Sequence, residues 1–133
     1  MSEKLVKLFF ETTETSQSAG RRFVQRLARR TEDKDTPTNG EAAGAQLAAM
    51  AAWARSGGEP YTDLKRITQP VLVTNGNNDI MIPTVNSFTL SAHLPNAQLI
   101  IYPDSGHGSL FQHAGAFTSH VSEFLDRNLD KTD

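Results

Sequence analysis

The sequence has 133 residues, of which 38% are hydrophobic and 21% are charged. This is the length of one domain with a modest core, and it excludes a compositionally disordered chain. The net charge of −2 argues against a nucleic-acid-binding protein. The absence of cysteine excludes disulfides, thiolate metal sites and a cysteine nucleophile.

The first residues, MSEKLVKLFFE, do not resemble a signal peptide, because the apolar part is too short and an acidic residue follows it too soon. No stretch of the sequence approaches the roughly 20 apolar residues that a membrane span needs. We therefore expect a soluble cytoplasmic protein with no membrane partner.

Residues 1–64 are predicted to be mainly helical. The segment TETSQSAGRRFVQRLARR predicts a helix with Thr13 or Thr15 as N-cap, because Ala19, Phe23 and Leu27 recur at helical spacing. The arginines between 21 and 30 are interpreted as its solvated face, so we expect no nucleic-acid partner.

A second helix is predicted for EAAGAQLAAMAAWARSGG. Thr38 and Glu41 have the spacing of a capping box, and glycines 57 and 58 end the pattern. The many alanines indicate tight helix packing, and Met50 and Trp53 are expected to lie in the core or to line a pocket.

Residues 65–133 have a different character. QPVLVTNG and AQLIIYP predict short strands, PTVNSFTLSAHL predicts a helix between them with Pro83 near its first turn, and a last helix is expected from Gln112 to Leu129. The sequence therefore predicts an α/β fold with a β-α-β-α unit and parallel strands. A hairpin turning at Asn75 and Gly76 is the alternative.

Chemistry-bearing residues follow both predicted strands. Asp79 comes after the first strand and His107 after the second, within YPDSGHGSLF, and the carboxyl ends of adjacent parallel strands meet at one edge of a sheet. A histidine base oriented by a carboxylate is one interpretation. A turn-forming Asp79 and an exposed His107 are the alternatives, and Asp104 is a rival acid. The four histidines lack the spacing of a metal site, and no cofactor is expected.

The segments PVLVTNGNNDIMIP and LPNAQLIIYPDSGHGSLFQHAGAFTSHVSEFLD resemble the C-terminal part of an α/β-hydrolase. The resemblance covers residues 65–127 closely and implies that Asp79 is the triad acid and His107 the triad base. Residues 1–64 resemble the cap of these enzymes with less detail. A hydrolase implies a small ester-like substrate, and Trp53, Met50 and Phe10 are candidates to line its pocket, with Phe9 as an alternative to Phe10.

The sequence departs from the family because it contains no Gly-x-Ser-x-Gly elbow for the nucleophile. Ser105 and Ser109 flank His107, but neither follows a strand in the way that an elbow requires. We therefore expect a fragment or truncated form of a hydrolase, inactive alone, whose missing nucleophile is a serine or an aspartate.

A sheet of so few strands leaves an unpaired edge along VLVT, which favours self-association or pairing with a complementing N-terminal half. The hypothesis from another functional class is a non-catalytic interaction module, or pseudo-enzyme, that binds a partner through this edge.

Overall fold

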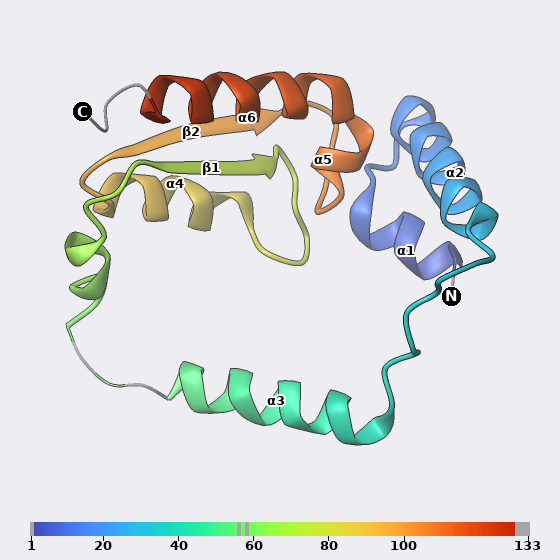
Figure 1. The fold of residues 1–133 in the computed structure, drawn as a ribbon, viewed down its shortest axis with the longest axis horizontal. Coiled ribbons are helices and arrows are strands. Elements are labelled where there is room, and N and C mark those ends of the chain that lie inside the picture. The colour runs from blue at the N-terminus through green and yellow to red at the C-terminus, as the bar shows by residue number, and fades with distance from the viewer. Residues whose placement is uncertain (1, 56, 58, 130–133) are drawn as a thin grey trace.

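The computed structural model describes residues 2–55, 57 and 59–129, and Figure 1 shows how its elements follow one another. The elements in chain order are α1 (Ser2–Phe9), α2 (Glu14–Arg29), α3 (Gly40–Ala54), the 3-10 helix η1 (Asp63–Arg66), β1 (Val71–Gly76), α4 (Thr84–His93), β2 (Ala97–Tyr102), α5 (Ser109–Gln112) and α6 (Ala114–Leu129).

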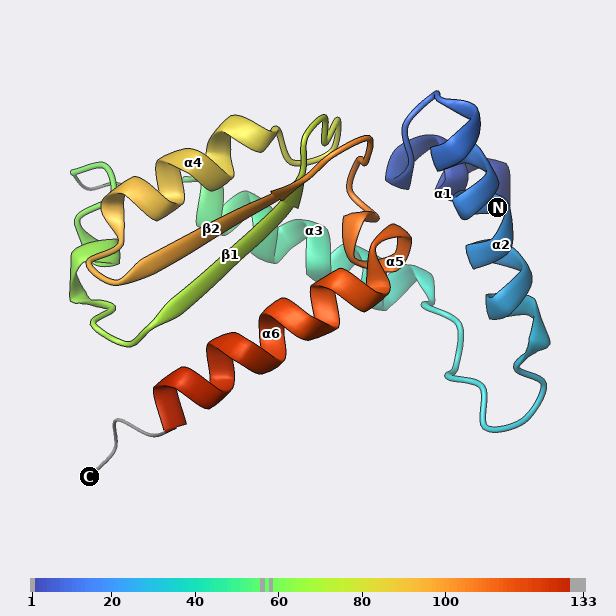
Figure 2. The same cartoon turned by 90° about the horizontal axis from the view of Figure 1, so that it is seen from above.

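The strands β1 and β2 pair in parallel, with Val71 opposite Ala97 and Gly76 opposite Tyr102. Helix α4 connects them, and Figures 1 and 2 place α4 and α6 on opposite sides of the strands. This confirms the predicted α/β fold with a β-α-β-α unit. The hairpin alternative is wrong, because the chain after Gly76 forms a turn and a loop that leads into α4.

The last helix differs from the prediction because it is broken at His113. Helix α5 ends at Gln112 and α6 begins at Ala114, with His113 at φ −106° and ψ 36°. At this break the Nε2 atom of His113 lies 2.9 Å from the carbonyl oxygen of Pro103, and its ring stacks on Tyr102. The break therefore coincides with a side chain that contacts the end of β2 and the loop after it.

Helices α1 and α2 pack on each other and form what we call the α1–α2 unit, residues 2–29. Thr13 is the N-cap of α2, as predicted, since its side-chain oxygen accepts a hydrogen bond of 3.2 Å from the backbone N–H of Ser16. Phe10 and Phe23 are buried where the helices meet, with ring centroids 5.8 Å apart. Their burial is the apolar contact that holds the two helices together.

Helix α3 contradicts the expectation of tight packing. None of its residues is buried, Leu47, Met50 and Trp53 are each at least 65% exposed, and Figure 1 shows the helix set apart from the others. Its N-cap is Asn39 rather than Thr38, because the Asn39 side chain accepts a 2.8 Å hydrogen bond from the N–H of Ala42. An apolar helix of this kind is ordinarily covered by other protein.

Across the part of the chain that the structure describes, no helix combines the length and the apolar character needed to cross a membrane.

Candidate active site

Asp79 lies in the turn that follows β1, three residues after Gly76. One carboxylate oxygen, Oδ1, accepts hydrogen bonds from the backbone N–H groups of Met81 (2.8 Å) and Ile82 (2.9 Å). The hydroxyl of Thr84 accepts from the N–H of Asp79 and donates to the carbonyl oxygen of Gly76. These bonds fix the carboxylate so that its other oxygen, Oδ2, points away from the turn.

The charge of Asp79 is stabilised in spite of burial, since its side chain is only 1% exposed. Burial by itself raises the pKa of this carboxyl, but the hydrogen bonds from Ile82, His107 and Met81 outweigh it. The pKa of Asp79 therefore lies below the ordinary aspartate value, and the group is a carboxylate at neutral pH.

His107 is held against this carboxylate by the loop that follows β2. Its Nδ1 atom lies 2.8 Å from Oδ2 of Asp79, across 28 residues of sequence. The His107 side chain is 35% exposed, and no residue in the described ranges bonds to its Nε2 atom. The pair thus joins a buried carboxylate to a partly exposed imidazole.

The two loops are joined by their backbones as well. The N–H of Ser105 donates to Oδ1 of Asn77 (3.1 Å), and the N–H of Asn78 donates to the carbonyl oxygen of Ser105 (3.2 Å). A Cβ on Gly76 would lie 2.1 Å from the Ser105 oxygen and 2.3 Å from that of Gly106. A glycine before the Asp79 turn is therefore required so that the loop carrying His107 can cross β1 at this point.

The glycines on either side of His107 serve a close approach to α1. The carbonyl oxygen of Phe9 accepts a 2.8 Å hydrogen bond from the N–H of Gly108, and a Cβ on Gly108 would lie 2.8 Å from the Phe9 Cβ. The Phe9 ring meets the His107 ring edge-on at 5.3 Å. From the sequence Phe9 is predicted only as an alternative pocket residue, and the adjacent phenylalanines 9 and 10 are the only signal for it.

The other candidates near His107 have different partners. The carboxylate of Asp104 accepts from the hydroxyl of Thr13, so the rival acid is engaged elsewhere. Ser105 is fully buried and its hydroxyl donates to the carbonyl oxygen of Tyr102. Ser109 is 3% exposed, at the start of α5. Neither serine follows β1 or β2 at a strand-to-helix elbow.

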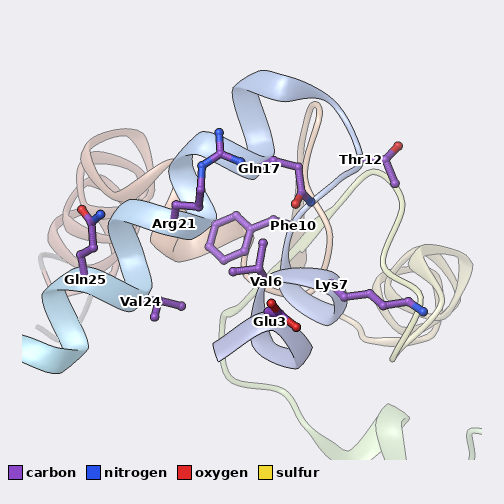
Figure 3. Close-up of a pocket in the computed structure, with 9 residues that line it drawn as sticks. All are labelled: Glu3, Val6, Lys7, Phe10, Thr12, Gln17, Arg21, Val24 and Gln25. Atoms are coloured by element: carbon purple, nitrogen blue, oxygen red, sulfur yellow. The ribbon is translucent and has the colours of Figure 1, made fainter. Parts of the chain in front are cut away.

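The predicted pocket residues do not come together. Phe10 lines a hollow of about 720 Å³ between α1 and α2 (Figure 3). Lys7 and Arg21 line the same hollow. Trp53 lines a separate hollow of about 620 Å³ that also includes Ile82, whose N–H holds Asp79. Met50 is 65% exposed on α3.

Among the described residues there is no group of His, Cys, Asp or Glu side chains that could hold a metal ion. An imidazole with one nitrogen bonded to a carboxylate and the other accessible is the arrangement of a general base.

Comparisons with known proteins identify the family to which the fold belongs. A family model described as TAP-like protein, an α/β-hydrolase group, matches residues 30–132. The chain is 38% identical over 64 residues to a 2-hydroxymuconate semialdehyde hydrolase from Pseudomonas putida, covering 48% of this chain and 23% of that protein. It is 35% identical over 81 residues to a 2-hydroxy-6-oxo-6-phenylhexa-2,4-dienoate hydrolase from Burkholderia cepacia, covering 61% of this chain and 27% of that protein.

A solved structure, an α/β-hydrolase fold protein from Chitinophaga pinensis, is similar over most of this chain. Its TM-score is 0.85 at 40% identity, and the match covers 95% of this chain and 45% of that one. The chain thus spans about a quarter of the length of these curated relatives and less than half of this solved structure. By its family match and its fold, the chain belongs to the α/β-hydrolase family.

Proposed function

We propose that this chain carries the acid and the base of a hydrolase triad, with Asp79 as the orienting acid and His107 as the base. The observation that carries the proposal is the 2.8 Å contact between His107 Nδ1 and Asp79 Oδ2. It leaves Nε2 of a partly exposed ring without a hydrogen-bond partner in the described ranges. The nucleophile and the oxyanion hole come from a part of the hydrolase fold that these residues do not contain, since the sequence has no Gly-x-Ser-x-Gly elbow.

The proposed mechanism moves one proton at each step. Nε2 of His107 takes the proton from a serine hydroxyl as its oxygen bonds to the substrate carbonyl carbon, or from a water if the nucleophile is an aspartate. The imidazolium that forms keeps its Nδ1–H on Asp79, whose carboxylate stabilises the positive charge. With a serine nucleophile, the proton passes from Nε2 to the leaving group as the bond to that group breaks. A water then gives a proton to Nε2 as its oxygen bonds to the acyl carbon, and the proton returns to the serine oxygen as the acyl–serine bond breaks.

The proposed substrate is a small organic molecule with an ester, a lactone or a related bond beside a carbonyl carbon. The names of the two relatives support a small organic substrate with a carbonyl group, since one is a hydrolase of a semialdehyde and the other of an oxo-dienoate. Phe9 lies beside the reacting imidazole and is our first choice for an apolar wall of the pocket. Phe10, Met50 and Trp53 remain predicted pocket residues. Met50 and Trp53 lie on α3, whose position against the rest of a complete hydrolase decides their role, whereas Phe10 borders the hollow between α1 and α2.

We assign residues 1–64 to a cap and residues 65–133 to the end of the hydrolase core. The direction of the hydrogen bonds between β1 and β2 supports the interpretation that the core is incomplete. Val71 N–H donates to the Asn96 oxygen and Asn77 N–H to the Tyr102 oxygen, so alternate residues face β2 and the N–H groups of Leu72 and Thr74 face the other edge. This edge pairs with a strand of an N-terminal half or with a second copy of the chain.

The test is hydrolysis of a short-chain p-nitrophenyl ester by the purified chain, alone and co-expressed with the part of the Chitinophaga pinensis protein that the match does not cover. His107→Ala is the matched control. We expect turnover only in the co-expressed pair and its loss in the variant. Turnover by the chain alone, lost in His107→Ala, would instead mean that this chain supplies a nucleophile.

The alternative is an interaction module that binds a partner through the edge of β1, and the unpaired N–H groups of Leu72 and Thr74 favour it. In that case the co-expressed pair forms a complex without turnover, and His107→Ala leaves the complex intact.

A further inference from the structure

The loop that carries His107 is held by hydrogen bonds from the α1–α2 unit and the residues between its helices. Close to His107, the carbonyl oxygen of Phe9 holds the N–H of Gly108 at 2.8 Å. At the start of the loop, the hydroxyl of Thr13 lies 2.7 and 2.8 Å from the two carboxylate oxygens of Asp104. The contacts lie on both sides of His107 in the sequence, so a movement of the α1–α2 unit would carry the imidazole with it.

Gln112 connects the His107 loop to helix α2. Its Nε2 donates to the carbonyl oxygen of Asp104 (2.7 Å), and its Oε1 accepts from the hydroxyl of Ser16 (2.7 Å). The oxygen of Ser16, which is fully buried, also accepts from the N–H of Glu11 (2.8 Å). Because a carbonyl can only accept, the amide must present its NH₂ to Asp104, and neither a carboxylate nor an alkyl side chain could replace it.

Asp104 is the residue at which the chain leaves β2 and turns back over β1. It has a φ of 48°, a left-handed conformation that is uncommon outside glycine and that aspartate tolerates. Its carboxylate is held by Thr13 and its carbonyl by Gln112, while the next residue, Ser105, is bonded to the Asp79 loop. The position of His107 relative to Asp79 thus depends on how this one turn is held.

Aromatic packing supports the same contact. The rings of Phe23 and Phe111 stack with centroids 4.5 Å apart. The Phe9 ring lies 6.3 Å from Phe111, 6.2 Å from Phe23 and 5.3 Å from His107. The apolar cluster therefore joins α1, α2 and α5 to the imidazole. The polar contacts at Asp104 fix where the loop that carries His107 lies on this cluster.

We propose that Gln112, with Thr13, Ser16 and Asp104, forms a positioning network through which the α1–α2 unit holds His107 in line with Asp79. These four residues touch no reacting atom and act through the loop. The proposal rests on the role of His107 as the base, and it adds that the α1–α2 unit sets the geometry of the base as well as covering it.

The experiment follows the His107 ring by ¹H and ¹⁵N NMR in the full chain, and so it needs no turnover. The first variant is Gln112→Glu, which still accepts from Ser16 but cannot donate to Asp104. The second is Thr13→Asp, which keeps an N-cap acceptor for α2 but repels Asp104. The control is Gln98→Glu, because Gln98 makes its bond to Arg127 on α6, away from the His107 loop.

In the wild type we expect a downfield Nδ1–H signal from the bond to Asp79. Both network variants should lose or shift this signal and mix the ring tautomers, while the amide signals of β1 and β2 stay in place. Gln98→Glu should leave the His107 signals unchanged. If the variants lower only the melting temperature and leave the His107 ring unchanged, the network is merely structural and the proposal is wrong.

The two proposals can fail separately. Absence of the Nδ1–H signal in the wild type would overturn the Asp79–His107 pair itself, and with it both proposals. A normal wild-type signal with unaffected variants would overturn only the positioning network.

Discussion

Gly76 of β1 lies directly against the carbonyl oxygen of Ser105, so that a Cβ on Gly76 would be 2.1 Å from that oxygen. Because Gly76 has no side chain, the end of β1 can lie directly beneath the loop that carries His107, three residues before Asp79. This contact links the packing of the two loops to the distance between Asp79 and His107.

We therefore expect Gly76→Ala to lower the free energy of unfolding and to disturb the Asp79–His107 contact, although it adds only one methyl group. The obstructing atoms belong to the backbone, so the His107 loop must move, at a cost of about 1–3 kcal/mol or more, and the Asp79–His107 bond should lengthen or break. Urea denaturation measures the free energy of unfolding, and NMR of the His107 ring reports the bond.

Gly44→Ala is the matched control for this substitution. Nothing lies within 4 Å of a Cβ at Gly44, and the residue is inside α3, where alanine is favoured over glycine by roughly 0.5–1 kcal/mol. Gly44→Ala should be neutral or stabilising. A Gly76→Ala chain as stable as the wild type would contradict the close approach.

Asp79→Asn is expected to change the tautomer of His107. The amide oxygen can still accept from Met81 and Ile82, which directs the NH₂ toward His107 Nδ1 and forces the ring proton onto Nε2. The nitrogen that should accept a proton is then blocked. In an assembled active hydrolase the rate should fall by about 10⁴-fold, as for a triad with the wrong tautomer.

The measurement for Asp79→Asn is ¹⁵N NMR of the ring, with Asp63→Asn as its control, because Asp63 is exposed on η1 and pairs with Arg66 rather than with the His107 loop. The two variants remove the same charge. If Asp79→Asn left the proton on Nδ1, the orienting role of Asp79 would be refuted.

The proximity of Asp79 and His107 could be predicted because two simple rules place them: parallel strands joined by one helix end at the same edge, and each residue follows its strand. The contact of Phe9 with His107 could not, since it depends on how the α1–α2 unit packs on a loop almost a hundred residues later. The break at His113 was hidden for a similar reason, because a bond to Pro103 interrupts an otherwise helical pattern. Local patterns determined the elements, and long-range packing determined the surroundings of the imidazole.

The lowered pKa of Asp79 predicts a pH dependence of folding. A carboxyl whose pKa is lower in the folded than in the unfolded chain contributes stability above the unfolded value, about 3.9, and loses it as the pH falls through the folded value. The difference in unfolding free energy between wild type and Asp79→Asn should therefore shrink as the pH falls below about 4. Urea titrations between neutral and acidic pH measure it, and a constant difference would contradict the lowered pKa.

The open edge of β1 gives the last prediction. The N–H groups of residues 72 and 74 face away from β2, so Thr74→Pro removes no hydrogen bond from the existing ladder but blocks a new strand from pairing. We expect the wild-type chain to self-associate with rising concentration and Thr74→Pro to remain monomeric and folded.

Val73→Pro is the comparison, because alternation in the ladder directs the Val73 N–H to β2, and this buried position should not tolerate the change. Sedimentation measures association, and circular dichroism reports folding. If Thr74→Pro associates as strongly as the wild type, the contact between copies must involve another surface, and the apolar side chains of α3 would be the next to replace. If instead Thr74→Pro unfolds as Val73→Pro does, the N–H of Thr74 is bonded within the chain and the edge of β1 is not open.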